Sequence, residues 1–290
     1  MLRKATIAIL QKQCEEVMGW NWTNGHKSPH ANIGGPIALA LLQSHHQDPQ
    51  PSVWITLSQY TLHLKKIYID KNIIPFRADI EYLALFGQHF NDKSAAKLGR
   101  DFFARVRART PNGQDEFKRI VDARTKTPEL VGYEVSIGVR AARALGEIDY
   151  AEQLVDATLA SETIKIDDNN NSYQVLSAGA FLYAITLLQN KKYNSVIAKL
   201  SKKLERLQRH NGAWAFNDTQ ATAYALLGLT GAKEYLKNNT SRQKAWAWLM
   251  QSQLKNGDWA IYHDGLPEPF VGQRNTLVQA ETLQAILAGI

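Results

Sequence analysis

The chain has 290 residues, of which 44% are hydrophobic and 21% are charged, and seven are Trp. This composition excludes a disordered chain and provides enough apolar material for a large core. The formal net charge of +7 favours anionic ligands, and the single cysteine, Cys14, excludes an internal disulfide and a multi-cysteine zinc site.

The first twelve residues are basic and then apolar, as a signal peptide would be. Their apolar run ends at Gln11, however, and no small-residue cleavage site follows. We therefore interpret this segment as an amphipathic helix and, with no signal peptide visible, expect a cytoplasmic protein by default. No apolar run reaches about 18 residues, so no membrane span is predicted.

Helical periodicity continues along the whole chain, and no stretch alternates as a half-buried strand does. Breaks at Gly, Pro and Asn clusters divide it into about twelve helices that are alternately amphipathic and apolar on most sides. In chain order the predicted helices cover 4–18, 31–46, 52–67, 77–90, 93–109, 131–145, 148–161, 172–189, 192–209, 217–230, 240–254 and 275–289.

Every second helix of this series, beginning with 31–46 and ending with 275–289, is apolar on most sides, which indicates that it is buried on most sides. The other six are amphipathic and suit an outer wall. Six buried helices that alternate with six amphipathic ones predict an all-α fold, a single (α/α)6 toroid domain over 1–290. Each hairpin in such a ring buries its apolar face only against its neighbours.

A short motif repeats in the last third of the chain. Gln208–Trp214 and Gln253–Trp259 both read Q-x-x-x-G-x-W, 45 residues apart, and each follows a charged helix and precedes an apolar one. Arg109–Asp115 contains a degraded copy centred on Gly113. The spacing matches one helical hairpin, with the glycine at a helix C-cap and the Trp packed on the next hairpin.

These repeats resemble those of the terpenoid cyclase and protein prenyltransferase superfamily, in which Q-x-x-x-G-x-W precedes an Ala-rich inner helix. Here that helix is Asp218–Leu229, with a looser match over 275–287. The resemblance covers about 195–290 and implies the toroid fold.

The activities of that superfamily are not implied, because its catalytic motifs are missing. Its alkene-protonating cyclases use an Asp-x-Asp-Asp motif, whereas Asp167–Asp168 lacks the preceding Asp. Its prenyltransferases bind zinc through Asp, Cys and His, and Cys14 has no Asp at the required spacing. The same ring is similar to the scaffold of glycosidases, sugar epimerases and polysaccharide lyases, an analogy of fold alone.

The candidate site lies where the inner helices begin. If all inner helices run the same way, their N-termini meet at one rim, where backbone N–H groups favour an anion. The loops that lead into them cover 19–30, 69–79, 110–133, 162–173, 210–219 and 255–276, and hold many aromatic and polar residues. From these we predict acid–base roles for Asp79, Tyr133 and Asp218. The predicted ligand-binding residues are Trp22, His26, His30, Arg77, Tyr173, Trp214, Trp259, Arg274 and Asn275.

Each candidate also has a structural interpretation. Asp79, Asp218 and Asn275 begin inner helices, where N-capping explains such residues without any chemistry. Glu134 and Glu281 lie in apolar helices and require buried partners, so each is either a salt bridge or a perturbed acid.

No metal site and no cofactor are predicted. His26 and His30 are four positions apart in the chain, a spacing that on a helix would allow both to bind one metal ion. Pro29 argues against a helix there. The P-loop, G-x-G-x-x-G, H-E-x-x-H and G-x-S-x-G motifs do not occur. The basic run over 191–209 has helical spacing and suits a solvated face, so we expect no nucleic acid partner.

Two functions remain open. The first is an enzyme, a lyase or hydrolase whose rim cavity takes a small molecule or oligosaccharide, with an anionic one favoured. The alternative is a non-catalytic terpenoid-cyclase-like binding or interaction module. The sequence does not indicate an oligomeric state.

Overall fold

The computed structural model describes residues 2–14, 18–21, 29–30, 32–70, 73–260 and 276–289. These ranges contain thirteen α-helices, four short 3-10 helices and no β-strand. The α-helices are α1 Leu2–Leu10, α2 Gly34–Gln47, α3 Pro51–Asp70, α4 Arg77–His89, α5 Lys93–Arg107, α6 Gly113–Ala123, α7 Val131–Ala144, α8 Ile148–Ala160, α9 Ser172–Leu187, α10 Asn194–Leu207, α11 Thr219–Gly231, α12 Thr240–Gln251 and α13 Thr276–Ala288. The 3-10 helices are Pro128–Leu130, Lys191–Tyr193, Ala215–Asn217 and Lys233–Tyr235.

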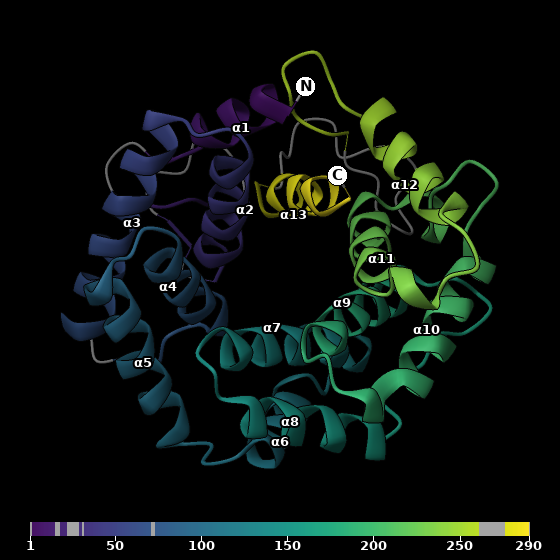
Figure 1. Ribbon diagram of the computed structural model, residues 1–290, viewed down its shortest axis with the longest axis horizontal. Helices are drawn as coiled ribbons and strands as arrows, with labels where there is room; N and C mark the ends of the chain where they lie inside the picture. Colours follow the sequence, from purple (N-terminus) through teal and green to yellow (C-terminus); the bar gives the residue numbers. More distant parts are fainter. Residues whose placement is uncertain are drawn as a thin grey trace.

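Six helices form a closed inner ring (Figure 1). Helices α2, α4, α7, α9, α11 and α13 contact one another in that order, and α13 contacts α2 again. Hydrogen bonds join like ends of neighbouring helices: Gln88 donates to the Ala144 carbonyl at 2.9 Å, and the Ser172 hydroxyl donates to Asp218 at 3.0 Å. The inner helices therefore run in one direction, and the (α/α)6 toroid predicted from the sequence is confirmed.

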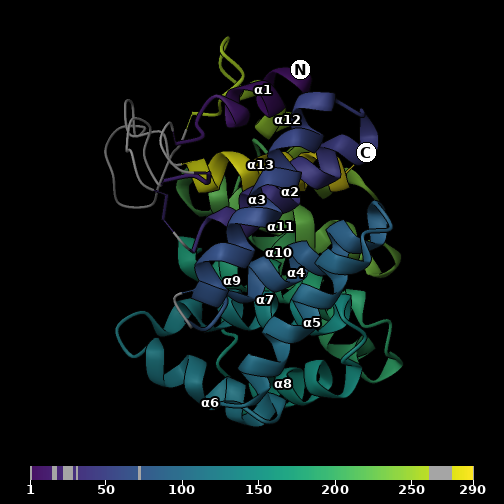
Figure 2. The same cartoon turned by 90° about the vertical axis from the view of Figure 1, so that its left-hand side faces the viewer.

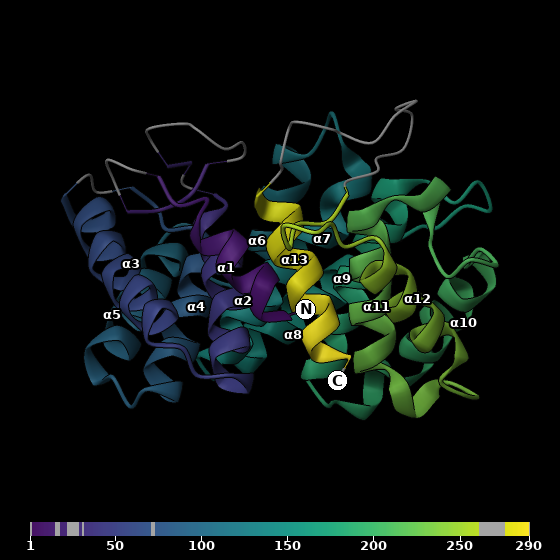
Figure 3. The ribbon, with the colours of Figure 1, turned by 90° about the horizontal axis from the view of Figure 1, so that it is seen from above.

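The outer wall consists of amphipathic helices. Helices α3, α5, α8, α10 and α12 pack on α2, α4, α7, α9 and α11 respectively, and α1 packs on both α13 and α2. Figure 3 shows α13 crossing the thickness of the ring between the two ends of this wall. No helix in the described ranges is both long and apolar enough to cross a membrane.

Helix α6 was not predicted, because it lies in the segment 110–133 that we expected to be a loop. Phe117, Ile120 and Val121 have the spacing of an amphipathic helix, but the Pro-Asn-Gly cluster at 111–113 just before them indicates a turn. Asn112 caps it by accepting a hydrogen bond from the Asp115 N–H at 2.9 Å. Gly113 thus begins a helix rather than ending one, and the degraded repeat predicted here is wrong. Figure 2 shows α6 beside α8 at one end of the molecule.

The Q-x-x-x-G-x-W motif joins successive outer helices. In the first copy the Trp214 indole is fully buried, and its N–H donates to the Leu204 carbonyl at 2.9 Å. Gln208 donates to the Gly212 carbonyl at 2.9 Å and to the Ser241 carbonyl, in the first turn of α12, at 2.8 Å. The motif therefore stabilises the wall.

A third copy lies at the N-terminus, where α1 ends at Leu10 and not near 18 as predicted. Gln13 and Trp20 form an isolated antiparallel bridge, as Gln253 and Trp259 do. Trp20 is fully buried, and Gly19 has a φ of +136°. In this copy one extra residue separates Gln from Trp, and the glycine lies directly before the Trp, so a search for the regular spacing misses it.

We expect Gly212→Ala to lower the free energy of unfolding by clearly more than Gly146→Ala does. Both glycines have positive φ, +98° and +81°, so both alanine variants incur strain of about 1 kcal/mol. Only at Gly212 would the new Cβ clash, 2.4 Å from the Lys244 carbonyl oxygen; nothing lies within 4 Å at Gly146. Urea denaturation followed by circular dichroism measures both, and equal losses would contradict the packing role of Gly212.

Candidate functional site

Glu281 is a carboxyl group inside the inner ring. It lies in α13, where the sequence is apolar on most sides, and its side chain is 3% exposed. The hydroxyls of Tyr133 in α7 and Tyr224 in α11 donate to its Oε1 at 2.9 and 2.6 Å, and Gln220 donates to its Oε2 at 2.6 Å. Burial raises the pKa of Glu281 above its ordinary value, although these donors oppose the rise. At a given pH a larger fraction of Glu281 is therefore protonated than of an exposed glutamate.

A second carboxylate, Glu81 in α4, faces α7. Arg140 Nε donates to Glu81 Oε1 at 2.9 Å, and both side chains are buried. The other oxygen, Glu81 Oε2, is buried without a hydrogen-bond partner in the described part of the chain. A buried charged oxygen left unpaired is costly, so this atom marks a position where a water or ligand would donate.

The two carboxylates belong to one group of side chains. The charge of Arg140 acts on Tyr224 and on Glu281, and its guanidinium lies 5.7 Å from the ring centre of Tyr183. We call this group the inner-ring cluster; its members are Glu81, Tyr133, Arg140, Tyr183, Gln220, Tyr224 and Glu281. They come from α4, α7, α9, α11 and α13, five of the six inner helices.

The cluster gives its two carboxyl groups different environments. Glu81 has a bonded counter-charge, whereas Glu281 is bonded by neutral donors and has a raised pKa. Pairs of carboxyl groups whose environments differ in this way act as acid and base in enzymes. Of the three predicted acid–base residues, only Tyr133 belongs to this cluster.

Asp79 lies in the wall between α2, α3 and α4. Its carboxylate accepts hydrogen bonds from Tyr60 at 2.8 Å, from Tyr68 at 2.5 Å, and from the Gly35 backbone N–H at the start of α2. A Cβ on Gly35 would lie 2.7 Å from Asp79 Oδ1, so this approach requires glycine. Asp79 does not cap its own helix, whose N-cap residue is Phe76.

The buried position of Asp79 predicts a pH-dependent stability. Burial raises the pKa of Asp79 from 3.8 to about 7. Between these values the folded state binds more protons than the unfolded state, so stability falls as pH rises, on the order of 1 kcal/mol per pH unit. Above pH 7 the contribution is constant.

We therefore expect Asp79→Asn to gain stability relative to the wild type as pH rises from 4 to 7. Urea midpoints across this range give the two slopes, and Asp122→Asn, at an exposed position of α6, is the control. Parallel curves for wild type and Asp79→Asn would show that Asp79 does not titrate in this window.

Asp218 and Arg77 hold elements of the rim together. Asp218 caps α11 by accepting from the Ala221 N–H at 2.7 Å, and it also accepts from the Ser172 hydroxyl. Arg77 makes two hydrogen bonds to Glu116, at 2.9 and 2.8 Å, which attach α6 to α4. Asp79, Tyr133 and Asp218 thus have different bonding partners and do not form one acid–base group.

Two of the predicted aromatic ligand contacts lie in the wall. Trp214 and Trp259 are buried, with 0% and 2% exposure, so neither indole offers a face to a ligand. Tyr173 is half-buried in the first turn of α9. His30 is exposed, and its ring nitrogen Nδ1 forms a hydrogen bond with the side-chain oxygen of Asn32. The remaining predicted residues, Trp22, His26, Arg274 and Asn275, lie outside the described residues.

The two ambiguous glutamates have opposite outcomes. Glu134 forms a half-exposed ion pair with Arg124, so the salt-bridge interpretation applies to it. Glu281 is instead the perturbed acid. Sequence reasoning did not select Glu81 or Arg140, although both are charged residues in helices that are apolar on most sides, the signal that had drawn attention to Glu281.

No group of His, Cys, Asp and Glu in the described ranges has the arrangement needed to hold a metal ion. The fold and the inner-ring cluster define this protein as an (α/α)6 toroid with ionisable groups inside its inner ring. No family model matches the sequence.

Solved structures share this fold over more than nine tenths of their length. An inactive variant of an α-1,6-mannanase from Salegentibacter sp. HEL1_6, in complex with α-1,6-mannotriose, has a TM-score of 0.68 at 9% identity, with 99% of this chain and 97% of that chain covered. A possible GH105 member from Salmonella enterica serovar Paratyphi A has a TM-score of 0.62 at 11% identity, covering 99% and 92%. A type II terpene cyclase from Scytonema in complex with its product has a TM-score of 0.57 at 17% identity, covering 100% and 99%. At these identities the likeness establishes the fold alone.

Proposed function

We propose that this toroid is an enzyme that acts on a saccharide within its inner ring, with Glu281 as the proton donor. The observation that supports this most directly is the burial of Glu281 among Tyr133, Tyr224 and Gln220. A carboxylic acid with a raised pKa and oriented hydroxyl neighbours is the usual form of a general acid.

Glu81 supplies the second carboxylate that hydrolysis of a glycosidic bond requires. Glu281 would protonate the glycosidic oxygen as the bond to the anomeric carbon breaks. Glu81 would accept a proton from the attacking water as the new C–O bond forms. Arg140 holds Glu81 through Oε1 and leaves Oε2 available for this proton. Tyr133 and Tyr224 then stabilise the Glu281 carboxylate that results.

Two of the structural neighbours support a saccharide substrate. The α-1,6-mannanase is bound to mannotriose, and GH105 is a glycoside hydrolase family. In the inactive mannanase variant two consecutive aspartates are replaced. The consecutive Asp167 and Asp168 of this chain are exposed, and Asp168 pairs with Lys203 and Arg206 on α10, so we assign them no role.

The test is a substrate panel on the wild-type protein. It contains α-1,6-mannotriose and mannotetraose, a uronate oligosaccharide chosen because of the +7 net charge, and a prenyl diphosphate. Chromatography detects products, and thermal shift detects binding. We expect products from one saccharide class. Saccharide binding without product would indicate a binding module, and stabilisation by the prenyl diphosphate alone would contradict the proposal.

A further inference from the structure

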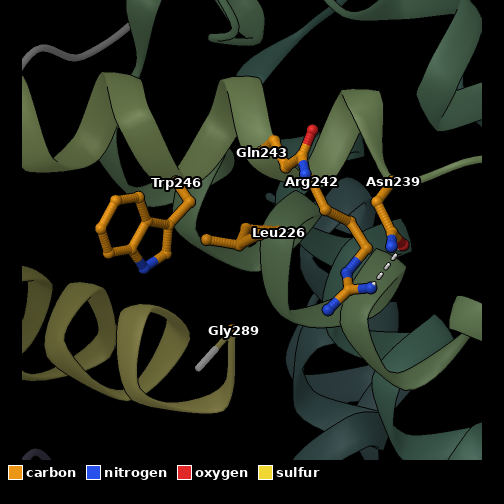
Figure 4. A pocket seen from close by; sticks show the side chains of 6 residues that line it. All are labelled: Leu226, Asn239, Arg242, Gln243, Trp246 and Gly289. Atoms are coloured by element: carbon orange, nitrogen blue, oxygen red, sulfur yellow. Dashed lines mark hydrogen bonds between the residues drawn. The ribbon is translucent and has the colours of Figure 1, made fainter.

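A recess lies beside one outer helix and two inner helices, and no residue of the inner-ring cluster lines it. It has a volume of about 240 Å³ and lies between α11, α12 and the last residues of α13 (Figure 4). It is lined by Leu226, Asn239, Arg242, Gln243, Trp246 and Gly289. None of these six residues belongs to the inner-ring cluster, and four of them lie in α12 or just before it, in the outer wall. The recess is therefore a separate candidate binding site.

Two donors share one face of this recess. Arg242 and Trp246 are four residues apart on α12, so their side chains project on the same side, as Figure 4 shows. The Trp246 indole N–H is buried and has no hydrogen-bond partner in the described part of the chain. A buried N–H in this state is normally satisfied by an acceptor, and the acceptor here would enter through the recess.

Arg242 has a charge that no carboxylate in the described ranges pairs with. Its Nη1 donates to Asn239 Oδ1 at 2.9 Å, and its Nε is 3.4 Å from Thr230 Oγ1. These bonds to neutral groups orient the guanidinium without neutralising it. Asn239 precedes the first turn of α12, and the N-terminal end of a helix also favours negative charge.

From this geometry we infer that the recess binds a small organic carboxylate. The carboxylate would accept from the free edge of the Arg242 guanidinium and from the Trp246 N–H. Leu226 and the indole provide an apolar surface for a ring-sized body, and the volume limits the ligand to about that size. This inference does not depend on the proposed function, because none of these residues belongs to the inner-ring cluster.

The test follows the indole N–H resonances by ¹⁵N–¹H NMR, with Trp246→Phe used to assign the signal of Trp246. The probes are two matched pairs, benzoate with benzyl alcohol and D-glucuronate with D-glucose. At least one carboxylate should shift the Trp246 signal to saturation, while its neutral partner should not. Arg242→Gln should lower the affinity for that carboxylate by about tenfold or more. Lys244→Gln, which removes an equal charge from an exposed position of α12, should leave affinity unchanged.

The inference is overturned if neither carboxylate shifts the Trp246 signal, or if Arg242→Gln and Lys244→Gln weaken binding equally. Shifts produced by the neutral partners as strongly as by the carboxylates would also overturn it. A Glu281→Gln variant separates the two sites, because it should reduce turnover of a saccharide by about 10²- to 10⁴-fold and leave the response of Trp246 unchanged.

Discussion

Glu281→Gln should reduce turnover of the saccharide substrate by about 10²- to 10⁴-fold, since glutamine has the shape of the protonated acid but cannot release a proton. Substrate affinity and the far-ultraviolet circular dichroism should remain close to those of the wild type. The measurement is kcat, with product quantified by chromatography.

Glu134→Gln is the matched control for this variant. Glu134 lies in an inner helix near the same rim, but its ion pair with Arg124 is half-exposed. If both variants lose activity to the same extent, Glu281 has no special role as an acid.

The pH profile gives a second readout of the same acid. Because Glu281 donates in its protonated form, turnover should fall as pH rises through its raised pKa. Tyr133 and Tyr224 lower that pKa by donating to the carboxylate. Tyr133→Phe should therefore move the basic limb of the profile to higher pH. A loss of rate with no movement of the limb would contradict the proposed bonding role of Tyr133.

Arg140→Met should lower the free energy of unfolding by about 3–5 kcal/mol, because it leaves Glu81 buried without a counter-charge. Glu81 and Arg140 are 7% and 6% exposed, so bulk water would solvate the unpaired carboxylate poorly. Adding Glu81→Leu to Arg140→Met should recover most of the loss. Urea denaturation near neutral pH measures all the variants.

The exposed ion pair of Arg107 and Glu147 provides the comparison. Their side chains are 49% and 40% exposed, so Arg107→Met should change stability by less than about 1 kcal/mol. If the double variant at 81 and 140 is no more stable than Arg140→Met alone, the loss comes from packing and not from an unpaired charge.

The architecture could be predicted from the sequence because the burial of each helix in a toroid determines which of its faces are apolar. Inner helices such as α9 and α11 are apolar on most sides, and two copies of Q-x-x-x-G-x-W mark the hairpin length. Helix α6 was missed although its apolar residues have helical spacing, because the Pro-Asn-Gly cluster at 111–113 indicates a loop. Its attachment to α4 could not be predicted, because the ion pair of Arg77 and Glu116 joins residues far apart in the chain.

The site could be predicted only in part. The sequence indicates that Glu281 needs a buried partner, but not whether that partner is a cation or a hydroxyl. The difference depends on contacts between residues far apart in the chain, such as Tyr133 and Glu281, separated by 148 positions. The search of the rim loops instead selected Asp218 and Asp79, whose bonds in the structure join or cap neighbouring helices.

The position of α13 relates the proposed acid to the topology of the chain. This helix closes the ring against α2 and α1, and the nearby ion pair between Lys12 and Asp258 joins positions 246 residues apart. Contacts between residues this far apart have the largest entropic cost of loop closure. We therefore expect the contacts at this junction to form last when the ring folds. If the junction opened, water would reach Glu281 and its pKa would return toward that of an ordinary glutamate. The titration of Glu281 would then report directly on whether the ring is closed.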